Sequence, residues 1–191
     1  MSTVPIANAY PARFDVQYTE VRSRVSVLFR LILIIPIVIV VALLSGANLA
    51  IAVALMLLFR RRYPEPWFRW ALYLNQLTNR VGAYALLLVD EYPSTTDQQQ
   101  VTVEADLDET QLSRWMPLVK WFLAIPHYIA LVFLFLVVAL VVLLAWFIII
   151  ITGRFPRGLF GFVVGVMRWT WRVTAYVSLL TTDRYPPFSL Q

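Results

Sequence analysis

The sequence predicts a mainly α-helical membrane protein made of two tandem copies of one unit, both inserted in the same orientation. Three short motifs recur along the chain at an offset of 90 to 93 residues. They are Ile35-Pro36 with Ile125-Pro126, residues 80–84 with 172–176, and Asp90-Glu91-Tyr92-Pro93 with Asp183-Arg184-Tyr185-Pro186. A repeat with a fixed period indicates two copies of one structural module. We expect the copies to be residues 1–93 and 94–191.

The membrane assignment rests on composition. Hydrophobic residues make up 60% of the chain and charged residues 14%, which is far from the average of soluble domains. Residues 31–59 and 121–153 contain no Asp, Glu, Lys or Arg. Because one membrane helix needs about 20 apolar residues, each run is too long for one comfortable span. Each is also slightly short for two, unless Arg30 or Lys120 extends its side chain to the surface.

We therefore predict a transmembrane helical hairpin in each unit and about four spans in total. The first hairpin is expected over about residues 25–60, with turn residues at 45–48. The second is expected over about 116–152, with a turn near 133–137 that rests on analogy with the first unit. The alternative is one long tilted helix per unit. Such a helix would be about 45 Å long, more than a hydrocarbon core of about 30 Å.

Each hairpin is preceded by a stretch with the periodicity of a strand. Apolar and polar residues alternate over about residues 12–19 and again over about 100–108. A period of two is typical of a half-buried strand. We expect the two strands to pair with each other at the cytoplasmic surface of the membrane.

Each hairpin is followed by an amphipathic stretch, at about residues 65–89 and 157–181. Apolar residues recur there at steps of three and four, and arginines occupy another face, which is typical of a helix in the membrane interface. All 16 Lys and Arg residues lie outside the two charge-free runs. With hairpins, the positive-inside rule places both termini in the cytoplasm.

Four segments carry a resemblance to a known family. They are LVKWFLAIPHY at residues 118–128, TGRFPRGLF at 152–160, RWTWRVTAY at 168–176 and TDRYPPF at 182–188. Together they resemble DUF4389, a bacterial membrane family of unknown function. The resemblance implies a protein of the bacterial inner membrane with duplicated segments, and it implies no activity. The first unit departs from the pattern, since Ile37-Val38 stand where the second has His127-Tyr128.

A few residues suggest special roles. His127 is the one histidine and lies at the edge of a membrane run, where it could relay protons, bind a metal or pack between helices. A metal site normally needs three or four ligands, so we expect packing and no metal. Pro36 and Pro126 predict helix kinks, because proline removes a backbone donor. Gly161 and Gly165 have the spacing of close helix contacts.

Basic and aromatic residues of the amphipathic stretches are candidate contacts for lipid headgroups or a partner: Arg80, Arg168, Arg172, Trp169 and Trp171. Basic residues near an anionic cytoplasmic surface contribute about 1 kcal/mol each. The alternative is that these arginines pair with Asp90 and Asp183 inside the protein.

The sequence offers no catalytic constellation. It has no cysteine, no nucleophile–base pair and no phosphate-binding glycine loop, so we expect no enzyme and no cofactor. The net charge of +5 follows from membrane topology, so we expect no nucleic-acid partner. We expect a structural or accessory scaffold, with the lipid bilayer and another membrane protein or a second copy as partners. The alternative is a protein that handles lipid or small solutes, as a transporter or channel, through the cleft between the units.

Overall fold

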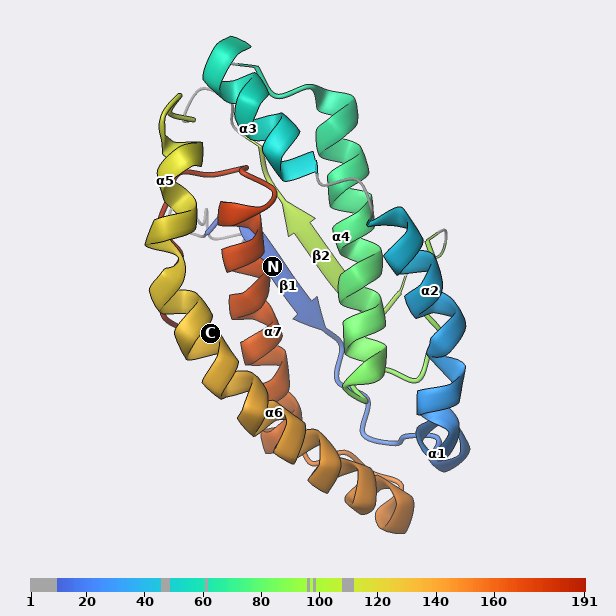
Figure 1. The fold of residues 1–191 in the computed structure, drawn as a ribbon. Coiled ribbons are helices and arrows are strands. Elements are labelled where there is room, and N and C mark those ends of the chain that lie inside the picture. The colour runs from blue at the N-terminus through green and yellow to red at the C-terminus, as the bar shows by residue number, and fades with distance from the viewer. Residues whose placement is uncertain (1–9, 46–48, 61, 96, 98, 108–111) are drawn as a thin grey trace, which may run out of the picture.

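The computed structural model describes the chain except for residues 1–9, 46–48, 61, 96, 98 and 108–111. The described elements are, in order, β1 (Ala12–Val16), α1 (Arg24–Leu33), α2 (Ile35–Leu44), α3 (Leu49–Arg60), α4 (Glu65–Ala85), β2 (Val101–Ala105), α5 (Met116–Leu123), α6 (Ile125–Thr152) and α7 (Arg157–Val177). Figure 1 shows their arrangement. The protein is mainly helical, and each unit begins with a strand and continues with helices, as predicted.

The two strands form an antiparallel ribbon. Phe14 of β1 lies opposite Val103 of β2, and Ala12 lies opposite Ala105. Buried and exposed residues alternate along β1, so one face of the ribbon packs on protein and the other faces outward. The predicted strands and their pairing are confirmed, although each strand is shorter than predicted.

Helices α4 and α7 form the layer beneath the ribbon. α7 packs on β1, and α4 packs on β2 (Figure 1). The Trp171 indole donates to the carbonyl of Glu104 at 3.0 Å, and the Gln76 amide donates to the carbonyl of Val103 at 3.0 Å. Both helices begin where the amphipathic stretches were predicted to begin. Most of α7 is buried, because α6 and the ribbon both pack on it, and its predicted position in the membrane interface stays a prediction.

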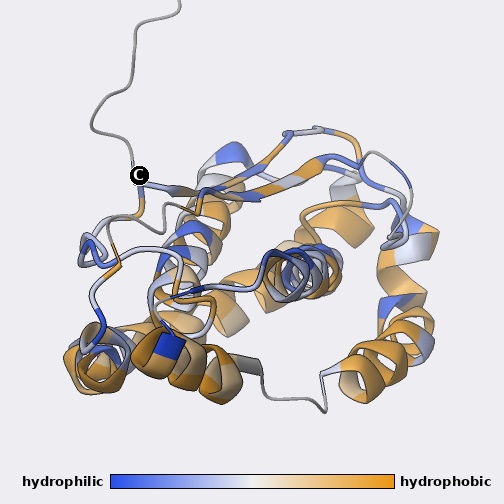
Figure 2. Ribbon diagram, turned by 90° about the horizontal axis from the view of Figure 1, so that it is seen from above, coloured by the Kyte–Doolittle hydropathy of each residue, from blue (hydrophilic) through white to orange (hydrophobic). Residues whose placement is uncertain are grey.

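The other helices form an outer layer. α1 contacts α6 and α3 contacts α5, which makes two seams between the units. The two outer runs, α1–α2 and α5–α6, flank the inner helices and run in opposite directions (Figure 1). Seen from above, the ribbon lies on one side of the molecule, and the most hydrophobic helices lie mainly on the other (Figure 2).

Each outer run contains a break at its proline. α1 and α2 meet at an angle of 43°, and Pro36 lies in the first turn of α2. α5 gives way to α6 at Ala124, and Pro126 lies in the first turn of α6. The first turn of a helix tolerates proline because its N–H groups have no partner within the helix.

α6 is one continuous helix of 28 residues, so the hairpin predicted for the second unit, with its turn near 133–137, is wrong. No glycine and no further proline interrupts this segment after Pro126. One side of α6 is buried along its length, at His127, Leu131, Val138, Ala145 and Ile149. A continuous helix is the conformation that presents these residues on one face.

The first unit is laid out in a similar way, although residues 46–48 of its predicted turn lie outside the described residues. Arg30 of α1 reaches the carbonyl of Tyr84 near the end of α4. Leu57 of α3 instead packs with Tyr63, just before α4 begins. Helices α1, α2 and α3 therefore follow α4 from one end to the other. α3 does not fold back onto α1, as the predicted hairpin requires.

Among the described residues, fewer helices than predicted are long and apolar enough to cross a membrane. Within the described part of the chain, α6 is the one helix long and apolar enough to cross a bilayer alone, and α1 with α2 reaches that length only as a bent pair. The predicted four spans are not confirmed.

Candidate functional site

The same buried ion pair occurs once in each unit. Arg30 Nη2 of α1 lies 2.6 Å from Asp90 Oδ1, and Lys120 Nζ of α5 lies 2.8 Å from Asp183 Oδ1. The two cationic side chains are only 3% and 0% exposed. The cations are 90 residues apart and the acids 93 apart, which is the offset of the repeat. The ion pair therefore belongs to the repeated module.

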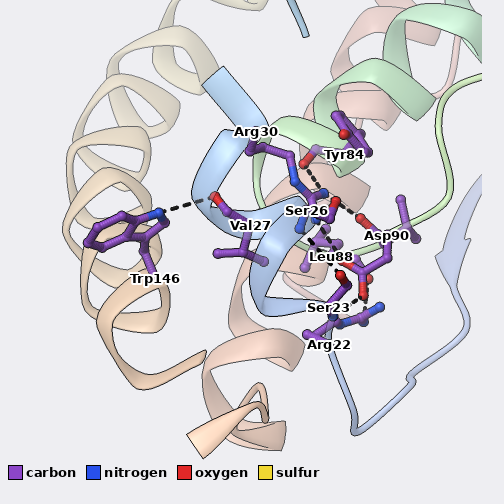
Figure 3. A network of polar contacts seen from close by, with 10 residues as sticks. Arg22, Ser23, Ser26, Val27, Arg30, Tyr84, Leu88, Asp90 and Trp146 are labelled. Atoms are coloured by element: carbon purple, nitrogen blue, oxygen red, sulfur yellow. Dashed lines mark hydrogen bonds and ion pairs between the residues drawn. The ribbon is translucent and has the colours of Figure 1, made fainter. Parts of the chain in front are cut away.

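A tyrosine ring and at least one backbone carbonyl also contact each cation. Arg30 donates to the carbonyl of Tyr84 at 2.8 Å, and its guanidinium carbon lies 4.0 Å from the centre of the Tyr84 ring (Figure 3). Lys120 donates to the carbonyl of Thr182 at 2.7 Å and lies 5.1 Å from the centre of the Tyr176 ring. Cation–π contacts and hydrogen bonds offset part of the cost of burying a charge.

Each aspartate also joins the segment after an inner helix to the start of an outer helix. The Ser23 N–H donates to Asp90 Oδ2 at 2.8 Å, and the Ser113 N–H donates to the Asp183 carboxylate. Ser23 is the N-cap of α1 (Figure 3), and Ser113 precedes α5. One carboxylate thus holds together two segments that are far apart in the sequence.

A left-handed backbone turn precedes each aspartate. Leu87 and Leu180 have φ angles of 64° and 57°, and each lies three residues before the acid of its unit. This conformation costs a residue with a side chain about 1–2 kcal/mol. Both leucines are buried, at 2% and 0% exposure, and burying a leucine contributes about 1.5–3 kcal/mol. Side-chain burial therefore offsets the strain that directs the acid toward the cation.

The ion pair of the second unit is closed to substrates. Burial lowers the pKa of Lys120 below its ordinary value of 10.5, and the hydrogen bond and charge of Asp183 oppose that shift. A carboxylate, a backbone carbonyl and an aromatic ring surround the ammonium group of Lys120. This is the geometry of an ion pair that stabilises the fold. Among the described residues, no three His, Asp or Glu side chains gather where they could hold a metal ion.

The outer helices expose an apolar face on α1, α2, α5 and α6. Its most exposed members, each more than 60% exposed, include Leu31, Leu43, Phe122, Val132, Phe133, Leu140 and Ile151. The inner helix α7 exposes no large hydrophobic side chain. Monomeric soluble proteins rarely leave such an extended apolar patch in water, so this face indicates contact with lipid or with another protein.

Two apolar hollows lie at the seams between the units. One of about 460 Å³ lies between α1 and α6 and is lined by Val27, Ala139 and Trp146 among others. The other, of about 430 Å³, lies between α3 and α5 and is lined by Ile51 and Trp121 among others. The Trp146 indole donates to the carbonyl of Val27 at 3.2 Å across the first seam. The hollows lie at related places in the two units.

Comparison with known families identifies both units. The family described as a domain of unknown function, DUF4389, matches residues 24–96 and 114–189. The chain belongs to the DUF4389 family. The resemblance seen in the sequence is thus confirmed, and each copy of the DUF4389 domain contains one ion pair, while β1 and β2 precede the matched segments. No curated protein and no solved structure matches the chain.

His127 is buried inside this DUF4389 protein. Its side chain is 0% exposed. Nδ1 accepts a hydrogen bond from the Trp169 indole at 3.0 Å, and the imidazole stacks on Phe188 with ring centres 4.0 Å apart. Tyr185 also packs against it, with ring centres 4.8 Å apart. The arrangement is that of a packing histidine, the role expected from the sequence.

Two of the predicted headgroup arginines, Arg168 and Arg172, face the ribbon and the C-terminal segment, and Arg80 faces the segment after α4. Arg168 donates to Asp15 at 2.9 Å and to the carbonyl of Phe14 at 3.0 Å. Arg172 donates to the carbonyl of Ser189 at 3.3 Å, and Arg80 donates to the carbonyl of Ser94. Trp169 and Trp171 are buried and bonded to His127 and Glu104. All five side chains thus have partners within the chain, and Trp169 faces α6 while Trp171 faces the ribbon.

The alternative pairing of Arg80 and Arg172 with Asp90 and Asp183 is wrong, because the acids pair with Arg30 and Lys120. The signal that could have identified the true cations is their own recurrence. A basic residue occurs at position 30 and again at 120, with the repeat offset, next to an otherwise charge-free run.

The glycine pair of α7 does not act as one unit. A Cβ at Gly165 would lie 2.8 Å from the carbonyl oxygen of Leu190, whereas a Cβ at Gly161 would meet nothing within 4 Å. Gly165 therefore allows the C-terminal segment to approach α7, and Gly161 has no such role.

Proposed function

We propose that this DUF4389 protein is a non-catalytic membrane scaffold that docks a partner protein at the cytoplasmic face of the bacterial inner membrane. The observation that carries the proposal is the two-sided architecture. The apolar face lies on the outer helices, and the charged ribbon lies mainly on the opposite side (Figure 2). One side suits lipid and the other suits a protein in water.

The outward face of the ribbon has charges that a partner could engage. Arg13 lies 3.9 Å from Glu104 and 3.5 Å from Asp106, and these side chains are 57% to 69% exposed. Such exposed pairs contribute only about 0–1 kcal/mol, so exchanging them for contacts with a partner costs little. Electrostatic complementarity of this kind confers specificity and speeds association.

The buried ion pairs support a rigid scaffold. Breaking a buried pair costs about 3–5 kcal/mol, so each unit resists separation of its outer helix from the segment after its inner helix. The C-terminal segment packs beside the ribbon, where Arg168 and Arg172 hold it. Placing the ribbon in the cytoplasm therefore places the C-terminus there too, as the charge rule predicts for both termini.

Site-specific photocrosslinking in native membranes tests the scaffold. A photoreactive residue at Thr102, exposed on β2, should yield one discrete protein adduct, and the same protein should co-purify at fixed stoichiometry in a native mass spectrum. The variant Arg13→Glu should reduce that adduct. The control Arg69→Glu, which alters an exposed pair on α4, should leave it unchanged. Reproducible turnover or solute flux by the purified protein alone would refute the proposal.

The two seam hollows favour lipid handling as the second candidate function. Each is apolar and has the volume of a small ligand site. Lipid adducts that survive purification, with no protein partner, would favour this candidate. Ala139→Phe should then reduce those adducts, because Ala139 lines the first hollow. The outward-facing neighbour Leu140→Phe is the matched control.

A further inference from the structure

We propose that the protein lies in the plane of one membrane leaflet. The apolar face of α1, α2, α5 and α6 inserts among the lipid chains, and arginines at the two ends of that face bind the phosphates of anionic headgroups. The ligand of the apolar face is therefore a phospholipid leaflet. The inference rests on the membrane attachment in the proposed function and defines its geometry.

Helix α6 lies along the protein and does not project from it. His127, in its first turn, accepts a hydrogen bond from Trp169 of α7. Near its other end, Trp146 bonds α1 through Val27, and Ile149 is 0% exposed. α6 is thus supported on one side over its full length, so its direction in the membrane is tied to that of α7.

The ribbon and the chain after it run beside the same length of α6, on the far side of α7. Arg168, next to the residue that contacts His127, donates to the carbonyl of Phe14 in β1. The Tyr18 hydroxyl donates to the carbonyl of Phe155 at 2.7 Å, near the opposite end of α6. An α6 standing upright in the bilayer would carry the ribbon into the hydrocarbon with it.

The hydrocarbon core cannot accommodate this ribbon. An open strand edge leaves backbone groups that only water can satisfy, and such edges do not occur among lipid chains. Asp15 and Glu104 on the ribbon are 71% and 57% exposed, and charges at membrane depth are strongly unfavourable. Lying flat, the protein keeps the ribbon in water. It also avoids forcing α6, about 42 Å long, across a core of about 30 Å.

Arginines lie in two clusters, one at each end of the apolar face. One cluster lies at the start of α1 and just after the end of α6: Arg24, Arg154 and Arg157, of which Arg154 lies 3.7 Å from the exposed Glu20. A Cβ at Gly153 would lie 3.3 Å from Arg24 Nε, so the two segments meet there. The other cluster lies where α3 ends and α5 approaches: Arg60 and Arg62, which are exposed, and Arg114, which is partly buried. Arg114 donates to the carbonyl of Leu58 in α3.

The two clusters are complementary to an anionic leaflet. An apolar helical face with basic residues at its border is the pattern of proteins that lie in the membrane interface, where the apolar side enters about 5–10 Å. A second copy of the chain would instead bring the clusters of like charge toward each other if the faces packed together. Charge therefore favours lipid over self-association as the occupant of this face.

Depth measurements on α6 test the inference, and the absence of cysteine makes single-cysteine labelling simple. Val132→Cys, Leu140→Cys and Ile151→Cys replace outward-facing side chains, and Thr102→Cys on the ribbon is the control for water. Each variant receives a fluorophore and is reconstituted in vesicles of phosphatidylcholine and phosphatidylglycerol. Lipids brominated at different carbons then report the depth of each label.

We expect the three α6 labels to lie at equal, shallow depths and the Thr102 label to be unquenched by lipid. An upright α6 would place Leu140 near the bilayer centre, about 12 Å deeper than Val132 and about 16 Å deeper than Ile151. That graded profile would refute the in-plane geometry while leaving membrane attachment and partner docking intact. Labels at all three positions that no lipid quenches would refute the proposed membrane attachment as well, and a dimer mass would then identify a second copy as the occupant.

Discussion

Replacing Asp183 with asparagine removes the charge that balances Lys120 and nearly preserves the shape of the side chain. Lys120 is 0% exposed, and its Nζ lies 2.8 Å from the carboxylate, so its positive charge would remain buried without a counter-ion. Removing one partner of a buried ion pair costs about 3–5 kcal/mol. We expect the lower end, about 3 kcal/mol, because the Thr182 carbonyl and the Tyr176 ring still contact the ammonium group.

Thermal unfolding in detergent, followed by tryptophan fluorescence, measures this cost. For a chain of this size each kcal/mol shifts Tm by about 2–4 °C, so Asp183→Asn should lower Tm by about 6–12 °C. The control is Glu65→Gln, which breaks an ion pair with Arg69 whose side chains are 66% and 69% exposed. Exposed pairs contribute about 0–1 kcal/mol. A Tm for Asp183→Asn within about 2 °C of the Tm of this control would refute the structural role of the Lys120–Asp183 ion pair.

A double variant separates lost charge from lost shape. Replacing a buried ion pair with apolar residues of similar volume is often neutral or stabilising, so Lys120→Met with Asp183→Leu should recover most of the Tm lost in Asp183→Asn. Lys120→Met alone should be milder than Asp183→Asn, because Asp183 is 17% exposed and can reach water. The reverse order of the two single variants would contradict this explanation.

Two further predictions concern pH and the glycines of α7. Burial lowers the pKa of Lys120 in the folded state. At pH values between this lowered pKa and the ordinary value of 10.5, the folded protein therefore binds fewer protons than the unfolded protein. The stability of the fold rises with pH across that range. Without Asp183 the pKa of Lys120 in the folded state falls further. The difference in Tm between Asp183→Asn and the unchanged protein should therefore become smaller as the pH is raised from 7 toward 10. A difference that does not depend on pH would contradict this explanation. In α7, Gly161→Ala should stabilise by about 0.5–1 kcal/mol, since alanine favours a helix and nothing obstructs its Cβ. Gly165→Ala should destabilise by about 1–3 kcal/mol, because its Cβ would press on the Leu190 carbonyl; thermal unfolding of the two variants side by side tests both signs, and equal shifts would contradict them.

The elements that could be predicted are those in which apolar and polar residues alternate or recur with a regular spacing. Alternation of apolar and polar residues identified β1 and β2, and the repeat suggested that they pair. The spacing of apolar residues could not distinguish the predicted hairpin from the continuous helix α6. Nearly every residue of this segment is apolar, so the buried side from His127 to Ile149 does not stand out in composition from the exposed side. Hydrophobicity shows that a segment avoids water but does not tell a helix crossing a bilayer from one lying along protein and lipid.

The candidate site was harder to predict than the fold. Arg30 and Lys120 stand beside charge-free runs, where a long basic side chain ordinarily reaches toward water. In the structure both turn inward, because an acid 60 or 63 residues later in the chain returns to the start of the same outer helix. The left-handed turns at Leu87 and Leu180 produce that return, and leucine gives no sequence signal for such a conformation.

The features that recur and those that do not point to different roles. The ion pairs, the left-handed turns and the seam hollows recur with the repeat, so they belong to the frame that the two units of this chain share. The aromatic cluster around His127 occurs only in the second unit, because Ile37-Val38 replace His127-Tyr128 in the first. That cluster ties the start of α6 to the C-terminal segment through Tyr185 and Phe188. The C-terminal segment is in turn held beside the ribbon by Arg168. The histidine cluster therefore connects the apolar face to the proposed docking face, and it does so in one unit only.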